Sequence, residues 1–189
     1  MKYNEDKTPL NYQITEFDCG TATVLNAISY LYNRDRISPK SYKKIVQNTT
    51  DRNWLGQIGK GGSSNMAMVE TCKYLKIFKE ELKNEEVSIN NKNLIKNIKE
   101  GAIAILQVYQ ENYRHYVLLT KLDDEYGYVF DPYYYPPTYY DKDKACQVIE
   151  DKPFEYNRKI KLQRFENKDR KDFALVKGDL GQIIILAKY

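Results

Sequence analysis

The stretch Gln13-Ile-Thr-Glu-Phe-Asp-Cys-Gly-Thr-Ala-Thr-Val-Leu-Asn-Ala-Ile-Ser-Tyr-Leu-Tyr32 decides the fold of this chain. Apolar residues recur in it at helical spacing, at Val24, Leu25, Ile28 and Leu31. Asp18 stands just before them as the expected N-cap, so Cys19 falls in the first turn of a helix. The positive end of a helix dipole favours a thiolate at that place. We therefore expect a reactive thiol there, although a small buried cysteine that only packs is the alternative that this stretch leaves open.

Length and composition indicate one globular domain spanning residues 1–189. The chain is 42% hydrophobic and 30% charged, which is typical of a protein with a well-filled core. Its net charge of +4 is small and the two signs are interspersed, so we expect no nucleic-acid partner. No apolar run is long enough for membrane insertion, and the start of the chain carries no signal-peptide pattern. A cytoplasmic location is the expectation that follows.

The three cysteines are Cys19, Cys72 and Cys146. They are too few and too far apart for a disulfide framework or a zinc site of paired thiols. Cys72 and Cys146 lie among apolar neighbours and are expected to be small core residues. We predict no metal and no cofactor.

Residues 1–101 are predicted to form a mainly helical lobe. Ser38 and Pro39 carry the N-cap and first-turn signals of a second helix, which ends near Thr50. Further helices are expected at about 64–75 and 90–100, the last with Asn90 or Asn91 as its cap and Gly101 as its stop.

Residues 102–189 are predicted to form a mainly β lobe. Strands are expected at 102–109, 115–122, 126–130, 146–149, 159–165, 173–176 and 182–187. Helices followed by strands predict an α+β fold with a largely antiparallel sheet. The topology of residues 142–189 stays open at this point.

His115 is the one histidine of the chain, and it opens an apolar strand. Asp123 and Asp124 supply turn residues before a second strand that ends at Asp131. A turn centred near Asp123 would pair residues whose numbers sum to about 246, which places His115 opposite Asp131. Directly opposed residues share a face with Cβ atoms about 5 Å apart, so the carboxylate could accept a hydrogen bond from the imidazole.

These residue types can perform acyl transfer through a thioester. An imidazole oriented by a carboxylate can deprotonate a thiol and later protonate a leaving amine. The oxyanion that develops on the attacked carbonyl also needs hydrogen-bond donors. The backbone N–H of Cys19 can be one, and the side-chain amide of Gln13 can be the other if its loop folds back on the helix start.

In this order the residues resemble a papain-like cysteine peptidase. The similarity is greatest to the bacteriocin double-glycine-leader-processing peptidases, family 39 of the cysteine peptidases, and their stand-alone relatives. The matching residues are Gln13, Asp18-Cys19-Gly20 with Ala22 and Leu25, His115-Tyr116-Val117-Leu118, and Asp131-Pro132. The resemblance extends to about Tyr135. It implies a papain-like fold in which an N-terminal helical lobe packs on a C-terminal antiparallel sheet, with the active site in the cleft between them.

The same resemblance implies a role for each matching polar residue. Cys19 would be the nucleophile, His115 the base, Asp131 its orienter and Gln13 the oxyanion donor, acting on a peptide or protein substrate. Gly61-Gly62 is similar to the glycine pair ahead of a helix that binds extended substrate in papain-type enzymes. A glycine needed only for its backbone angles is the other interpretation of that pair.

The chain also departs from the pattern of those peptidases. Their peptidase domain usually precedes a membrane transporter, whereas this chain has no transmembrane helix, and residues from about Lys142 onward match nothing familiar. Leader processing therefore stays open. Two other functions do too: an acyltransferase using the same triad, and a catalytically idle binding module whose contact surface is the tyrosine-rich loop 133–140. Those tyrosines would form a binding rim or cover one edge of the core.

Overall fold

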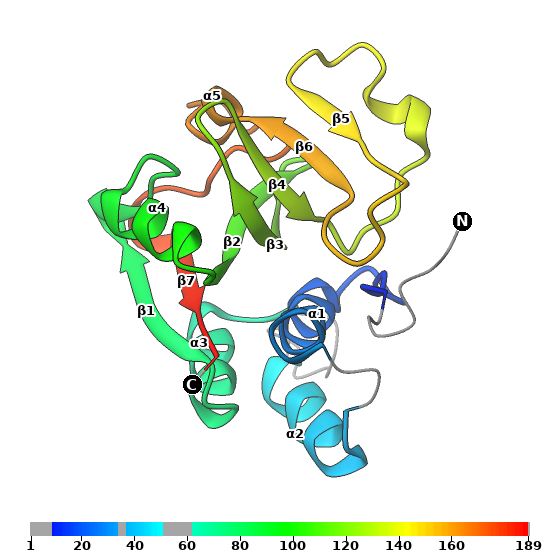
Figure 1. Cartoon of the computed structure of the whole chain (residues 1–189), viewed down its shortest axis with the longest axis vertical. Coiled ribbons are helices and arrows are strands. Elements are labelled where there is room, and N and C mark those ends of the chain that lie inside the picture. The colour runs from blue at the N-terminus through cyan, green and yellow to red at the C-terminus, as the bar shows by residue number, and fades with distance from the viewer. Residues whose placement is uncertain (1–8, 34–36, 51–61, 189) are drawn as a thin grey trace.

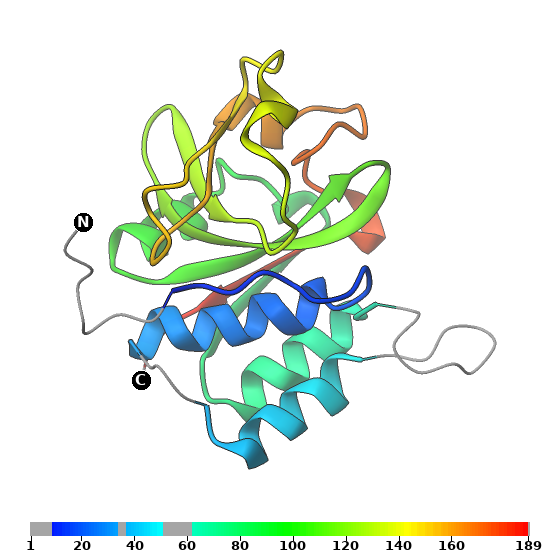
Figure 2. The same ribbon diagram turned by 90° about the vertical axis from the view of Figure 1, so that its right-hand side faces the viewer.

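The structure is a computed structural model that describes residues 9–33, 37–50 and 62–188. Helices α1 (Cys19–Tyr32), α2 (Pro39–Thr49) and α3 (Asn65–Tyr74) form a layer against one face of an antiparallel sheet. Figure 2 shows α1 running directly beneath the sheet, with α2 and α3 beyond it. The predicted α+β class is confirmed.

The sheet has seven strands in the order β1-β7-β2-β3-β4-β6-β5 (Figure 1). All neighbouring pairs are antiparallel. Their bounds are β1 Phe78–Lys83, β2 Ile103–Gln110, β3 Tyr113–Leu122, β4 Tyr126–Phe130, β5 Cys146–Val148, β6 Arg158–Lys161 and β7 Gln182–Leu186. The strands predicted from 102 to 130, at 146–149 and at 182–187 are confirmed.

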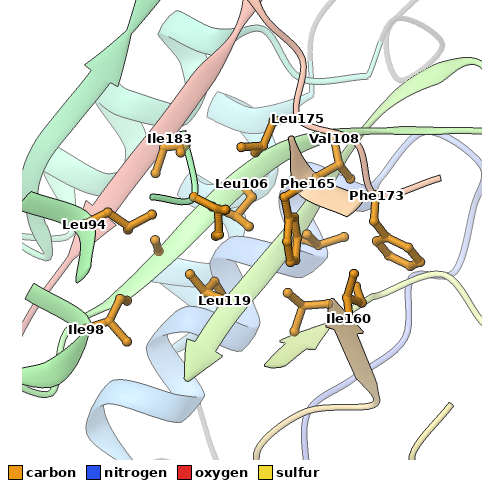
Figure 3. Close-up of a cluster of buried hydrophobic side chains, with 14 of the residues drawn as sticks. Leu94, Ile98, Leu106, Val108, Leu119, Ile160, Phe165, Phe173, Leu175 and Ile183 are labelled. Carbon is orange, nitrogen blue, oxygen red and sulfur yellow. The ribbon is translucent and has the colours of Figure 1, made fainter. Parts of the chain in front are cut away.

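Both faces of the central strands are buried. Residues of odd number in β2, such as Ile103 and Ile105, pack toward α1 and α3, whereas Leu106 and Val108 pack on the opposite face. That opposite face is covered by α4 (Lys92–Lys99) and α5 (Leu162–Phe165). Figure 3 shows its apolar cluster, with Leu94, Leu106, Leu119, Phe165 and Ile183 converging. Cys72 and Cys146 are fully buried, as the core assignment predicted.

Three helix boundaries follow from the capping residues that the sequence indicated. The Ser38 hydroxyl accepts from the Ser41 amide, with Pro39 at the first helical position. The side-chain oxygen of Asn91 accepts from the backbone N–H groups of Asn93 and Leu94 at the start of α4. Gly101 follows that helix with a φ of +91°, which a residue with a Cβ rarely adopts.

One predicted strand is right only in its first part, and another is wrong. Residues 159–165 form β6 only as far as Lys161, and the chain then turns into α5, which places the Phe165 ring against the open side of Gly127. Residues 173–176 form a single bridge, Val108 to Leu175, because Phe173 has a left-handed φ of +68° that interrupts extended backbone.

The segment assigned to the helical lobe also contains a strand that the sequence did not reveal. β1 is an edge strand, and it pairs with β7 rather than with a neighbour in sequence. The chain therefore returns at its end to place β7 between β1 and β2 (Figure 1). Three short 3-10 helices complete the described chain: η1 Asn84–Glu86, η2 Pro137–Tyr140 and η3 Gly178–Leu180.

Candidate active site

Cys19 is the first residue of α1, and Asp18 occupies the N-cap position. The predicted side-chain cap is wrong: the Asp18 carboxylate makes no hydrogen bond to the helix. It accepts instead from the backbone N–H groups of Ile14, at 3.1 Å, and Thr15, at 3.0 Å. Asp18 therefore holds the loop that carries Gln13 close to the start of the helix.

The sheet fixes the position of α1. The Thr23 hydroxyl donates to the backbone oxygen of Tyr116 on β3 at 3.0 Å. Gly20 lies so close to Ser63 that a Cβ would overlap with the serine side chain. These two contacts place the Cys19 thiol, which is 8% exposed, between the helix layer and the strand that carries His115.

His115 and Asp131 are buried and hydrogen-bonded to each other. The Nε2 atom of His115 lies 2.8 Å from Oδ1 of Asp131. The predicted register is wrong by two residues, because β3 and β4 pair Leu118 with Phe130. A shift of two leaves every side chain on its original face, so the two residues meet diagonally instead of directly.

The thiol and the imidazole interact, and each changes the pKa of the other. Burial raises the pKa of the Cys19 thiol, but the hydrogen bond and charge of His115, with two backbone hydrogen bonds, outweigh burial and lower it. Burial lowers the pKa of His115, but its hydrogen bonds to Asp131 and Cys19 outweigh this and raise it to about 10. Both directions favour a thiolate and an imidazolium. Because Nε2 bonds Asp131, Nδ1 is the ring nitrogen left for the thiol.

Asp131 is held by residues that the sequence analysis missed. Its backbone N–H donates to Oδ1 of Asn157 at 2.7 Å, and Nδ2 of Asn157 donates to its backbone oxygen at 2.8 Å. Oδ1 of Asp131 also accepts from the Tyr133 amide at 2.9 Å. The guanidinium of Arg158 lies 3.8 Å from the other carboxylate oxygen. Asn157 and Arg158 belong to the segment whose sequence matched nothing, so no local signal distinguished them.

Gln13 lies at the mouth of the same cavity as Cys19 and His115. Its backbone N–H donates to the Pro132 oxygen at 2.8 Å, which ties the loop to the end of β4. Its side-chain Nε2 donates to the Thr15 oxygen at 2.7 Å. An amide NH2 group carries two N–H donors, so a second one is left for a ligand.

The cavity has a volume of about 580 Å³ and runs between the helix layer and the β lobe. Gly62 lines it with a φ of +71°, whereas Gly61 lies outside the described residues. The positive φ accounts for a glycine at position 62 by itself. A substrate-binding role for this pair stays a prediction.

The tyrosine-rich loop lies partly in the core and partly beside the cavity, and a binding role for it stays a prediction. Tyr135 and Tyr140 are buried, and Tyr135 stacks on Tyr139 with ring centroids 4.1 Å apart. Tyr134 is exposed, and Tyr133 lines the cavity together with Tyr135. The loop therefore covers a core edge and borders the cavity.

Residues 9–33, 37–50 and 62–188 contain no group of three or more His, Cys, Asp or Glu side chains placed to hold a metal ion. Within the same ranges no helix has the length and apolar character needed to cross a membrane.

The chemistry that this arrangement permits is nucleophilic attack by a thiolate. The Cys19 thiol and the His115 imidazole interact and line the cavity, and the imidazole bonds the Asp131 carboxylate on its other side. Cys19, at the start of α1, and Gln13 line this same cavity, and N–H donors of this kind can bind an oxyanion.

Comparison with known proteins shows that the fold has relatives. No protein-family model and no curated protein matches the sequence. One similar structure is a double glycine motif protease from an AMS/PCAT transporter, solved in complex with the leader peptide. The alignment covers 97% of this chain and 94% of that protein, with a TM-score of 0.52 and 16% identity.

Two further solved structures have a similar fold. The peptidase domain of Streptococcus ComA, a bifunctional ABC transporter involved in a quorum-sensing pathway, matches 96% of this chain over 98% of its own, with a TM-score of 0.54 and 16% identity. The third is a Bacillus anthracis protein classed as a C39-like peptidase. The alignment covers 96% of this chain and 94% of that protein, with a TM-score of 0.56 and 15% identity. The expected papain-like fold is confirmed.

Proposed function

We propose that this chain is a thiol peptidase that hydrolyses a peptide bond through a Cys19-His115-Asp131 triad. One observation carries the proposal: the buried His115 bonds Asp131 at 2.8 Å through Nε2 and interacts through its other side with a thiol whose pKa is lowered. Structural packing alone does not require a thiol, an imidazole and a carboxylate to meet beside a cavity.

In the proposed reaction the Cys19 thiolate attacks the carbonyl carbon of the substrate. The N–H of Cys19 and the Gln13 amide stabilise the oxyanion. The imidazolium of His115 then gives its proton to the leaving amine, and a thioester remains on the sulfur. His115 deprotonates a water molecule, which hydrolyses the thioester and restores the free thiol. Asp131 holds the ring in the orientation that both transfers need.

A peptide is the substrate class that the cavity and the comparisons support. The cavity is open along the boundary of the two layers and carries polar and tyrosine side chains, which suits an extended main chain. One protein that shares the fold was solved with a leader peptide bound to it. We propose a peptide or protein segment as substrate here as well.

Digestion of a peptide library by the natural chain, Cys19→Ala and Cys72→Ala tests the proposal. The natural chain and Cys72→Ala should cleave the same peptides, because Cys72 is buried away from the cavity, whereas Cys19→Ala should cleave none. Cleavage that survives in Cys19→Ala would refute the triad. Adding a labelled amine separates the alternatives, because an acyltransferase would incorporate the amine in preference to forming the free acid.

A further inference from the structure

Arg158, on β6, has a buried guanidinium behind Asp131. It is 1% exposed and one of the largest fully buried side chains of the described residues. Its Nη2 atom lies 3.8 Å from Oδ2 of Asp131. The other oxygen, Oδ1, accepts from His115 and from the Tyr133 amide, whereas Oδ2 has no hydrogen-bond partner. The two cations therefore flank the carboxylate, each facing a different oxygen.

We infer that Arg158 is a positioning residue of the triad: its charge holds the Asp131 carboxylate directed at His115, and so sustains the reactive form of Cys19. The consequence for catalysis rests on the proposed peptidase function. The consequence for thiol reactivity does not, because the thiol can be followed without any substrate.

The charge balance of the site supports this role. Asp131 is 0% exposed, and a carboxylate removed from water is costly unless it is paired. With a thiolate and an imidazolium at the other end, the four groups carry alternating charges that sum to zero. Without the guanidinium, the same site would hold two negative charges and one positive charge. The excess negative charge would then favour the neutral thiol form of Cys19.

Other groups around Asp131 do not replace this charge. The charges of Asp131 and Arg158 affect the pKa of two neighbours, Tyr140 from η2 and Cys146 from β5. Burial raises the pKa of each, so both are neutral around neutral pH. Arg164 pairs with Asp143 at 2.7 Å. Among the described residues, His115 and Arg158 are the cations within 4.0 Å of Asp131.

The contacts of the guanidinium itself are few for so buried a group. Nη1 donates to the Asn157 backbone oxygen at 2.9 Å, and Nη2 donates to the Tyr133 backbone oxygen at 3.4 Å. The group also lies 5.9 Å from the centre of the Tyr140 ring. Nε has no partner. Both hydrogen bonds go to neutral backbone oxygens, so the Asp131 carboxylate is the group that compensates the buried positive charge.

The test compares Arg158→Met, which keeps an unbranched stem but removes the guanidinium, with Arg158→Lys, which keeps the charge. The rate of Cys19 labelling by iodoacetamide is measured across pH for both and for the natural chain. We expect Arg158→Met to shift the profile up by about one pH unit, which makes labelling roughly tenfold slower on its acid side. Arg158→Lys should keep the profile of the natural chain. Where a cleaved peptide is known, kcat should fall in Arg158→Met with KM unchanged.

The outcomes separate this inference from the proposed function. If the natural chain does not label Cys19 in preference to Cys72 and Cys146, the proposed function fails. If it does, but folded Arg158→Met keeps the natural pH profile, or Arg158→Lys is as impaired as Arg158→Met, the inference about Arg158 fails.

A double variant covers the case in which Arg158→Met does not fold. Asp131→Asn with Arg158→Met removes both buried charges, so it should fold when the single variant does not, because no unpaired carboxylate remains. If the double variant also fails to fold, Arg158 acts on the fold independently of Asp131, and the inference is overturned.

Discussion

Replacing His115 by alanine is expected to remove the selective reactivity of Cys19. Cys72 provides the internal reference for its size, because it is buried without a charged partner and burial raises its pKa to about 12. Cys19 is nearly as buried, but the interaction with His115 holds its pKa below the ordinary value. Without the imidazole, burial dominates, and only the backbone hydrogen bonds from Tyr116 and Gly20 oppose it.

We therefore expect the pKa of Cys19 in His115→Ala to rise by at least about two units, toward that of Cys72. At a pH below the pKa of Cys19 in the natural chain, this lowers the thiolate fraction about 100-fold and corresponds to about 2.7 kcal/mol. The assay is the rate of iodoacetamide labelling of each cysteine at about pH 7, read by mass spectrometry of the digested protein. Asp131→Asn should give a smaller loss, because the imidazole remains but loses its orienting carboxylate.

The labelling of Cys72 and Cys146 in the same sample reports whether the fold is intact, since both are buried. Selective loss at Cys19 with the other two unchanged is the expected result. If Cys19 in His115→Ala reacts as fast as in the natural chain, the thiolate does not depend on the imidazole and the argument for the triad is refuted.

Three further outcomes can be checked. Activity on a cleaved peptide should rise with pH as the Cys19 thiolate forms, below the pH range in which an ordinary thiol ionises. Activity should fall near pH 10, where His115 loses the proton that the leaving amine needs. A profile of kcat against pH measures both changes. Gln13→Ala should reduce kcat about 100-fold with little change in KM, which is the typical loss for one oxyanion donor. Steady-state kinetics that show a raised KM with kcat unchanged would mean that the amide only binds substrate. Gly20→Ala should lower the stability by about 1–3 kcal/mol, because the new methyl group overlaps with Ser63, and a thermal melt that matches the natural chain would contradict that packing.

Much of the candidate site could be predicted because each part has a local signal. The apolar spacing of α1 and the position of Cys19 at its start are readable from neighbouring residues. The strand patterns around His115 and Asp131 are readable in the same way. His115 and Asp131 still lie close together despite the two-residue error in the predicted register. Side chains in a strand alternate with a period of two, so a shift of two residues keeps each side chain on the same face.

The supporting groups had no such signal. Asp18 looks like an ordinary N-cap, and only the folded loop shows that its carboxylate binds the amides of Ile14 and Thr15 instead. Asn157 and Arg158 lie in the segment from about Lys142 onward, whose sequence matches nothing familiar. Their burial behind Asp131 depends on β6 pairing with β4, a contact between distant parts of the chain.

The sequence by itself determined the α+β class, the helix that starts at Cys19 and the set of residues Gln13, His115 and Asp131, because periodicity, capping and residue chemistry act over a few neighbours. Only the tertiary structure decided that β7 lies between β1 and β2 and that Asn157 and Arg158 support Asp131. An apolar strand can pair with any complementary strand, so its partner is chosen by the packing of the whole core and not by its own residues.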